Sequence, residues 1–282
     1  YNKIGAQRTV YLANYLAHDN VEVIVCKAVD EYYPGSIDYS NPINKNINLV
    51  HVENNKKYKL FHKRYQWYFS YKRIVKKICK RLNIDVVYIT GYPFFYFALG
   101  PYIKRKFDIE YVLDYRDPWY LDMLKKKDFD SLLLSLKYHT LKKIAKKEEM
   151  KSIRNAKFVV NVTERRTRDF IEFYDQIDSK KFITIENGFN DQLLCRQPVN
   201  PGHRNECTNS FNIGIMGKFA YYSNKNCAQL CAGIKSINYK NKISCTVHHV
   251  GVYEEDFYEN ADKANVLKHI IFHGTMEYTN AM

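Results

Sequence analysis

Residues 84–119 read IDVVYITGYPFFYFALGPYIKRKFDIEYVLDYRDPW, and this stretch decides the fold class. The β-branched runs at 85–90 and 109–114 predict two strands, and residues 94–107 between them predict a helix. A strand, a helix and a second strand in succession form a parallel pair, because parallel strands need a long crossover connection. The stretch therefore indicates an α/β protein built on a parallel sheet.

The same alternation extends in both directions along the chain. We expect further strands at 21–25, 47–52, 158–162 and 182–185, and further helices at 10–17, 58–82, 121–156 and 164–174. Strands that alternate with helices argue for a parallel sheet covered by helices on both faces. Ligands of such sheets bind beyond the carboxyl ends of the strands, so residues at those ends are the candidate functional residues.

A domain boundary is predicted near Asn187 and Gly188, where the alternation breaks and a polar linker at 196–210 follows. After the linker, strands are expected at 211–216, 244–250 and 270–273, and a helix at 227–237. We therefore predict an N-terminal domain at 1–187 and a C-terminal domain at 188–282, both Rossmann-like. The second domain is short and the chain opens at Tyr1 in a helical pattern, so we expect segments to be missing at both ends.

The composition limits the kinds of partner. The chain has 282 residues, 46% of them hydrophobic, and a formal net charge of +14. This charge favours a polyanionic partner, an anionic membrane surface or a phosphate-bearing ligand. No apolar run approaches the ~20 residues of a transmembrane helix. Seven cysteines without a regular framework are typical of reduced thiols in a cytoplasmic protein.

Charged and aromatic residues crowd the end of the strand at 109–114. Asp117 is the candidate catalytic carboxylate, which would orient or deprotonate a hydroxyl group. Asp114, Arg116 and Trp119 are candidates for binding an acceptor, because a carboxylate binds hydroxyl groups, a guanidinium binds phosphate and an indole stacks on a sugar. The alternative is an Asp–Arg pair that satisfies itself, beside a Trp that only packs.

Two further places lie in the first domain. Gly5 and Arg8 are expected in a loop immediately before the first helix, where free N–H groups and the helix dipole attract phosphate. A capping loop without a ligand is the alternative. Asn187 and Gly188 follow the strand at 182–185 and mark the predicted crossing between the domains, with a tight turn as the alternative.

In the second domain, Gly217, Lys218 and Lys225 lie between a strand and a helix. A glycine that lets the backbone approach and cations that neutralise charge suit a diphosphate, while ordinary solvated lysines are the alternative. Gly251 and Gly274 end the next two strands, and each permits either close approach of a ligand or merely a turn.

The segment 56–82 carries eleven Lys and Arg residues and no acidic residue, and its aromatic side chains recur at helical spacing. Such a helix can lie on an anionic membrane surface with its aromatic rings among the headgroups. The alternative is a surface helix that packs its aromatic stripe on its own sheet. We expect no nucleic-acid partner, because no nucleic-acid-binding motif accompanies the charge. The nine histidines show no metal-ligand pattern, so no metal is expected.

Several segments, taken in order, resemble the group 1 (family 4) glycosyltransferases. They are GAQRTVYLANYLAHDNVEVIVC at 5–26, IDVVYITGYP at 84–93, VLDYRDPW at 112–119, RNAKFVVNVTE at 154–164, ITIENGFN at 183–190, IGIMGKF at 213–219, VGVYEED at 250–256 and IIFHGTMEY at 270–278. The resemblance implies the GT-B fold, in which two Rossmann-like domains face each other across a cleft. By comparison with that fold, we expect the second domain of this chain to be an incomplete copy.

The resemblance also implies an activity. Family members transfer a sugar from a nucleotide-sugar donor, bound mostly by the second domain, to an acceptor, commonly with retention of stereochemistry and without a metal. Gly5, with Arg8 beside it, matches the loop that approaches the donor diphosphate from the first domain. The expected acceptor is a lipid-linked or glycan molecule in bacterial surface polysaccharide synthesis, and the expected location is peripheral, at the cytoplasmic face of the membrane.

The chain departs from the family pattern in ways that leave rivals open. Ser223 and Asn224 stand where many family members carry Arg in the donor loop, and Asn190 replaces the usual Asp. The family's paired-glutamate motif would lie beyond Met282, so this chain alone is expected to be inactive. A sugar-nucleotide epimerase on the same fold is one rival. A degenerate, non-catalytic subunit that binds a membrane or a partner is the other.

Overall fold

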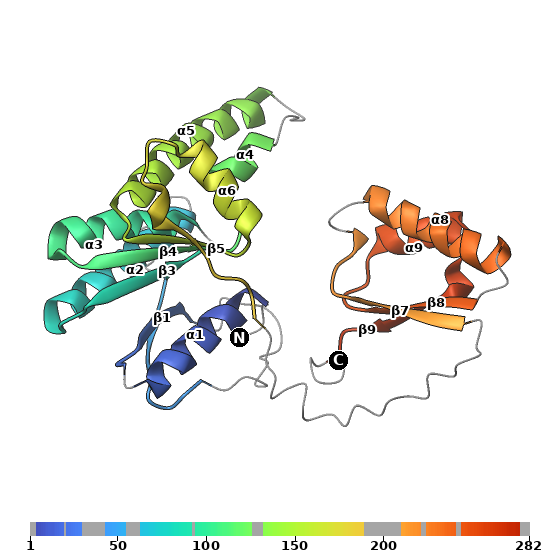
Figure 1. Ribbon diagram of the computed structural model, residues 1–282, viewed down its shortest axis with the longest axis horizontal. Coiled ribbons are helices and arrows are strands. Elements are labelled where there is room, and N and C mark those ends of the chain that lie inside the picture. The colour runs from blue at the N-terminus through green and yellow to red at the C-terminus, as the bar shows by residue number, and fades with distance from the viewer. Residues whose placement is uncertain are drawn as a thin grey trace. The chain divides into compact units, whose positions relative to one another are not determined.

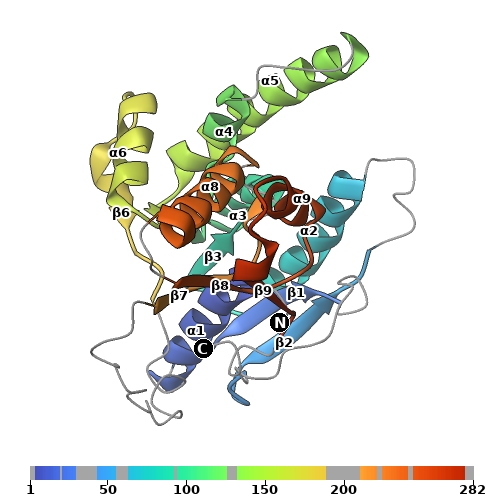
Figure 2. The same ribbon diagram turned by 90° about the vertical axis from the view of Figure 1, so that its right-hand side faces the viewer.

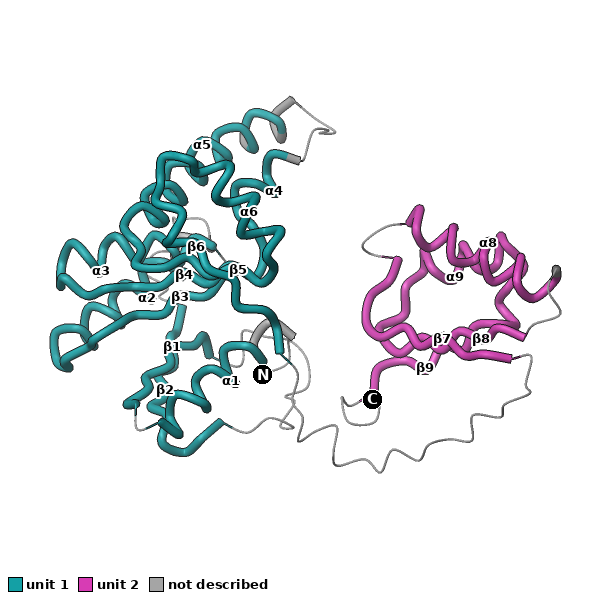
Figure 3. Tube along the Cα trace, viewed as in Figure 1, with its two compact units in different colours: residues 1–188 teal, residues 189–282 magenta. Residues whose placement is uncertain are grey.

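The computed structural model describes residues 4–19, 21–29, 43–54, 63–91, 94–125, 132–188, 210–220, 224–240 and 244–276. The chain divides into two compact units, unit 1 from Tyr1 to Gly188 and unit 2 from Phe189 to Met282 (Figure 3). The sequence places the boundary at residues 187 and 188. Every strand pair among the described residues is parallel, which confirms the α/β fold class.

Unit 1 alternates helices and strands along the chain (Figure 1). Its elements are α1 (Ile4–His18), β1 (Ile24–Ala28), β2 (Asn48–Val52), α2 (Lys63–Arg81), β3 (Val86–Thr90), η3 (Phe94–Ala98), α3 (Leu99–Phe107), β4 (Glu110–Tyr115), α4 (Tyr120–Lys125), α5 (Leu132–Asn155), β5 (Phe158–Asn161), α6 (Glu164–Phe173), η4 (Ser179–Lys181) and β6 (Phe182–Thr184). β1 pairs with β2, and the other four strands form one sheet in the order β3-β4-β5-β6. The register pairs Thr90 with Asp114 and Asp114 with Val160, so the carboxyl ends of three strands lie side by side.

The core of unit 1 is rich in aromatic side chains. Tyr111 and Tyr115 of β4, together with Phe97 and Phe170, have no exposed surface. α3 packs against β4, and a Cβ on Gly100 of α3 would overlap the ring of Tyr111. The close approach of helix and sheet therefore requires a glycine at this position.

The aromatic stripe of α2 packs inward, in agreement with the second of the two interpretations of this helix, and its contact with a membrane stays a prediction. Trp67 and Tyr71 are only 3% and 8% exposed, and Tyr68 packs against the same core. Lys72 lies over the ring of Tyr102 of α3, 4.4 Å from its centroid. The exposed side chains of α2 are cationic, and they include Arg73, Lys76, Lys77, Lys80 and Arg81. The earlier part of the predicted segment, residues 56–62, lies outside the described residues.

Unit 2 has one three-stranded sheet, covered on one side by helices. Its elements are β7 (Ser210–Met216), α8 (Asn224–Lys240), β8 (Ser244–Val250), α9 (Glu255–Lys263), η6 (Leu267–His269) and β9 (Ile270–Gly274), with strand order β7-β8-β9. Figures 1 and 2 both show α8 and α9 on the same side of this sheet. Cys227 and Cys231 of α8 are buried there against Val247 and Phe257, as free thiols.

Three local predictions need correction. α1 begins at Ile4, so Gly5 and Arg8 lie within the first helix and not in a loop before it. The strand expected at 21–25 is β1, which begins only at Ile24. α9 has no counterpart among the expected helices, because it is short and its buried apolar contacts come from Phe257 and Ala261 alone.

None of the helices that the structure describes is both long enough and apolar enough to cross a membrane.

Candidate functional site

A buried carboxylate lies at the carboxyl ends of β3 and β4. Asp114 is the penultimate residue of β4, and its side chain is only 1% exposed. The hydroxyl of Thr90, at the end of β3, donates a hydrogen bond of 3.2 Å to Asp114 Oδ2. Burying a carboxylate without a cationic or hydrogen-bonding partner costs folding free energy, so Asp114 is expected to have such a partner.

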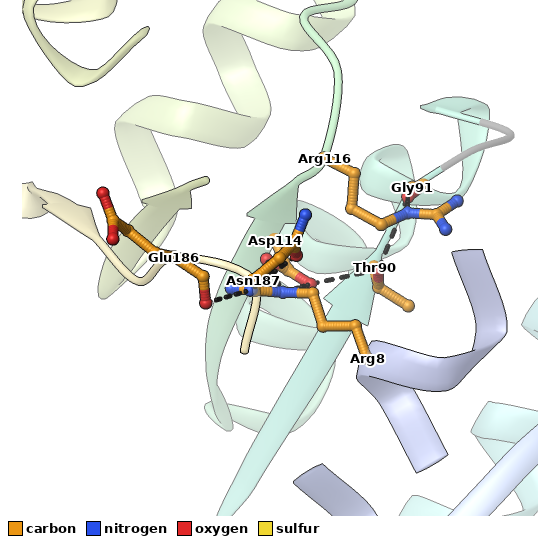
Figure 4. A network of polar contacts seen from close by, with 7 residues as sticks. All are labelled: Arg8, Thr90, Gly91, Asp114, Arg116, Glu186 and Asn187. Carbon is orange, nitrogen blue, oxygen red and sulfur yellow. Dashed lines mark hydrogen bonds and ion pairs between the residues drawn. The ribbon is translucent and has the colours of Figure 1, made fainter. Parts of the chain in front are cut away.

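Arg8 of α1 is that partner, and it connects three segments that are far apart in the sequence (Figure 4). Its Nε lies 3.3 Å and 3.2 Å from the two carboxylate oxygens of Asp114. Its Nη1 donates to the backbone oxygen of Glu186 over 3.0 Å and to Asn187 Oδ1 over 3.1 Å. Its Nη2 makes no hydrogen bond within the described part of the chain. Arg8 therefore joins the first helix, the central strand and the segment that leaves unit 1.

A tyrosine and a second arginine lie near this ion pair. Burial raises the pKa of the Tyr88 hydroxyl, and the neighbouring Asp114 carboxylate raises it further, so Tyr88 stays neutral and can donate a hydrogen bond. Arg116 donates from its Nε to the backbone oxygen of Gly91 over 2.7 Å, and its side chain is half-buried. Two guanidinium groups thus lie around the ends of β3 and β4.

The other two predicted residues follow on the same connection. Asp117 is exposed, in the loop between β4 and α4. Trp119 is half-buried and stacks on Phe94, with centroids 6.1 Å apart and ring planes inclined by 15°. The packing role considered for Trp119 is therefore realised, while its contact with an acceptor stays a prediction.

Glu149 of α5 fixes the start of α4, which follows Trp119. Its Oε2 accepts a hydrogen bond of 2.8 Å from the Tyr120 N–H, and its side chain is fully buried. Burial raises the pKa of Glu149 from its usual 4.5 to about 7, an effect that the Tyr120 N–H partly offsets. The hydroxyls of Tyr115 and Tyr174 lie beside this carboxyl without a well-formed hydrogen bond to any described residue.

In unit 2 the predicted glycines gather at the carboxyl ends of the strands. The Gly217 N–H donates to the Val250 oxygen over 2.8 Å, and the Gly251 N–H donates to the Gly274 oxygen over 2.9 Å. Gly217 and Gly274 have φ angles of 92° and 74°, which favour glycine. A Cβ on Gly251 would lie 2.6 Å from the Gly217 oxygen. These glycines therefore serve backbone turns and close packing, and their contact with a donor stays a prediction.

The two predicted donor-binding lysines lie on either side of residues 221–223, which are outside the described residues. Lys218 is exposed and lines a hollow of about 270 Å³ together with residues 252–256. Lys225 is exposed as the second residue of α8, which begins at Asn224. No distance relates the two lysines, so their shared role stays a prediction.

The backbone N–H groups after Lys218 are bound within unit 2, and the predicted contact of this loop with a diphosphate stays a prediction. The N–H groups of Phe219 and Ala220 donate to Glu254 Oε2 over 2.6 Å and 3.2 Å. Glu254 immediately precedes α9 and reaches across to the loop after β7. Any diphosphate would have to rely on Lys218 and other donors, because these two are engaged.

The structure thus brings Arg8, Asp114 and Asn187 into contact, with Arg116 alongside. Sequence reasoning singled these residues out separately but did not pair them. It missed Thr90 and Glu254, and their position next to strand ends was the signal that could have found them. Gly188 is exposed at the end of unit 1. Among the described residues, no group of three or more His, Cys, Asp and Glu side chains is arranged to hold a metal ion.

The chain was compared with protein families, curated proteins and solved structures. The model of Glycosyltransferase Family 4 matches residues 5–193. No curated protein matches the chain at a significant level.

Solved structures of glycosyltransferases share the fold. WaaG, a glycosyltransferase involved in lipopolysaccharide biosynthesis, matches with a TM-score of 0.62 and 15% identity over 100% of this chain and 70% of WaaG. WaaB, a lipopolysaccharide outer core galactosyltransferase, matches with a TM-score of 0.55 and 12% identity over 98% of this chain and 66% of WaaB. Trehalose-6-phosphate synthase from E. coli, bound with UDP-2-fluoro glucose, matches with a TM-score of 0.57 and 10% identity, over 98% of this chain and 72% of that one. All three are longer than this chain.

Proposed function

The chain belongs to glycosyltransferase family 4, and from this premise we propose that it serves to transfer a sugar from a nucleotide-sugar donor to an acceptor hydroxyl group. In this reaction the bond between the anomeric carbon and the diphosphate breaks, and a glycosidic bond to the acceptor oxygen forms. The acceptor proton leaves with the diphosphate or a nearby carboxylate. The family commonly retains the stereochemistry of the donor, and we propose the same here, without a metal.

The fixed guanidinium of Arg8 is the observation that carries this proposal. Asp114 holds Arg8 Nε, and Glu186 and Asn187 hold Nη1, so the orientation of the planar group is set before any ligand arrives. A guanidinium binds phosphate through parallel N–H donors, and Arg8 Nη2 donates to none of the residues that the structure describes. A group held in place in advance loses little conformational entropy when a charged ligand binds. We therefore propose that Arg8 contacts the donor diphosphate.

Asp114 takes a different role from the predicted acceptor contact. Its side chain is buried and accepts from both Arg8 and Thr90, so we propose that it positions Arg8. Asp117 remains the proposed catalytic carboxylate, because it is exposed on the connection that follows β4 and can reach a hydroxyl group there. Arg116 and Trp119 remain proposed acceptor contacts.

The donor is proposed to bind mainly to unit 2. Lys218 and Lys225 would neutralise the charge that develops on the departing diphosphate, and a water-poor site would strengthen that effect. Gly217, Gly251 and Gly274 would let the donor approach the ends of the strands. The trehalose-6-phosphate synthase relative, bound with a UDP-sugar analogue, supports a nucleotide-sugar as the donor class.

The acceptor is proposed to be a lipid-linked or glycan molecule in cell-surface polysaccharide synthesis. The similarity to WaaG and WaaB, which both act on lipopolysaccharide synthesis by their descriptions, supports this class. The exposed cations of α2 support a peripheral position on an anionic membrane, which we propose to be the cytoplasmic face.

Calorimetric titration of nucleotide-sugars into the full gene product that includes residues 1–282 tests the proposal. We expect micromolar binding of one UDP-, GDP- or ADP-sugar. The double variant Arg8→Gln/Asp114→Asn removes the cation and its buried counter-charge together, so it should fold but bind that donor about tenfold more weakly. Arg73→Gln, which removes an exposed cation of α2, is the matched control. Equal affinity in the double variant and the wild type would remove Arg8 from the donor site.

A further inference from the structure

The loop that carries Lys218 makes several hydrogen bonds and close contacts with residues 250–254 of unit 2. We refer to residues 217–220 as the glycine–lysine loop. The Gly217 N–H bonds to Val250, and the absence of a side chain at Gly251 lets the two loops approach within van der Waals contact. Both contacts lie at the carboxyl ends of β7 and β8, where ligands of parallel sheets bind.

The carboxylate of Glu254 also binds this loop. Its Oε2 accepts from two consecutive N–H groups of the loop, those of Phe219 and Ala220, and its side chain is 9% exposed. Glu254 is the N-cap residue of α9 but makes no side-chain hydrogen bond to that helix. A capping carboxylate ordinarily serves its own helix, so its engagement with another loop indicates a role in holding that loop.

His249 contacts the same loop through the Gly217 oxygen. It lies on β8 with only 1% of its surface exposed, and its Nε2 lies 2.9 Å from the Gly217 oxygen. The same nitrogen lies 3.7 Å from Glu254 Oε2. Because the Gly217 oxygen can only accept, Nε2 must carry a proton, which it donates to that oxygen.

We propose that Glu254 and His249 are positioning residues that hold the glycine–lysine loop so that Lys218 meets the diphosphate of the donor. This inference rests on the proposed function, since it assigns how the donor site of that function is built. The loop binds no anion through its Phe219 and Ala220 N–H groups, because Glu254 engages them. The loop instead offers the exposed side chain of Lys218, which lines the hollow, to the diphosphate.

The measurement compares UDP, GDP and ADP with their parent nucleosides by calorimetry on the full gene product. Glu254→Ala leaves two loop N–H groups without their partner, so the loop should sample other conformations. We expect the best nucleoside diphosphate to bind about tenfold more weakly, as one charge-assisted hydrogen bond would predict, with nucleoside affinity unchanged. Glu254→Gln keeps one acceptor oxygen and should restore part of the affinity. Asp262→Ala, which removes an exposed carboxylate of the same helix outside the hollow, is the matched control.

A double-mutant cycle with Lys218→Ala separates positioning from a general structural effect. If Glu254 acts through Lys218, the double variant Lys218→Ala/Glu254→Ala should bind the diphosphate no more weakly than Lys218→Ala alone. Additive losses would overturn the proposal. Tighter binding by Glu254→Ala would also overturn it, because it would show that the carboxylate occupies the place of the diphosphate.

Amide hydrogen exchange without ligand keeps the two proposals distinguishable. Exchange at Phe219 and Ala220 should rise in Glu254→Ala and in His249→Ala, while exchange in β9 should not. Unchanged exchange at Phe219 and Ala220 would show that Glu254 and His249 do not hold the loop, even if the wild type binds nucleotides. Binding of no nucleotide by a folded wild type would instead contradict the proposed function, and with it the purpose assigned to Lys218.

Discussion

Replacing Glu149 with Gln should make unit 1 more stable at neutral and alkaline pH. The carboxyl is fully buried, and burial raises its pKa from 4.5 to about 7. A carboxyl with a raised pKa binds more protons in the folded than in the unfolded state between these two values. Stability therefore falls as the pH rises from about 4.5 to 7, and the full cost of ionisation is present above pH 7.

The structure gives the size of this effect. The interval from 4.5 to about 7 corresponds, at about 1.36 kcal/mol for each pH unit, to about 3 kcal/mol. A glutamine cannot ionise, yet its amide oxygen can still accept the hydrogen bond from the Tyr120 N–H. Its NH₂ group can donate to the hydroxyls of Tyr115 and Tyr174, which lie beside the site. The variant should therefore match the wild type at about pH 4, below the unfolded pKa, and exceed it by about 3 kcal/mol at pH 8.

Urea unfolding at a series of pH values measures this difference. The only two tryptophans, Trp67 and Trp119, both belong to unit 1, so their fluorescence reports unit 1. Glu148→Gln, one residue earlier on α5 and not fully buried, controls for a change in net charge. A gain that does not depend on pH, or a Glu149→Gln variant less stable than the wild type at pH 8, would refute the reasoning.

Two glycine substitutions test the packing of each unit. Gly100→Ala should lower the stability of unit 1 by about 3 kcal/mol, because a methyl group would overlap the Tyr111 ring, and tryptophan fluorescence during urea unfolding would measure it. A loss below about 0.5 kcal/mol would contradict that overlap. Gly251→Ala should speed amide exchange in β7 and β8, because its methyl group would lie 2.6 Å from the Gly217 oxygen, and unchanged exchange would show that the two loops are further apart.

Much of the fold could be predicted from local patterns. The β-branched runs at 86–90 and 110–115 and the helix between them are periodic enough to identify by sequence, and the resemblance to family 4 glycosyltransferases is confirmed by the family match. α9 could not be predicted in the same way, because its two buried apolar residues form too short a pattern. The start of α1 at Ile4 was missed because a glycine near a helix terminus looks like a loop.

The site was predictable residue by residue but not as an arrangement. Arg8 and Asp114 were each singled out by their position beside a helix or strand end, yet 106 residues separate them in the chain. Their pairing depends on where α1 packs relative to β4, which no local pattern encodes. The aromatic stripe of α2 shows the same limit, since spacing identifies an apolar face but not what covers it. Trp67 and Tyr71 pack against the core of unit 1.

The most direct test of the central proposal is product analysis on the full gene product. The protein would be incubated with the nucleotide-sugar that binds it best and a lipid extract of the cells that make it, and the products followed by mass spectrometry. The account predicts release of the nucleoside diphosphate only when the extract is present, together with an acceptor heavier by one sugar residue, and much less of both in Asp117→Asn. Release of nucleoside diphosphate and a rearranged free sugar without any acceptor would contradict it in favour of an epimerase, and binding without turnover in any extract would contradict it in favour of a non-catalytic subunit.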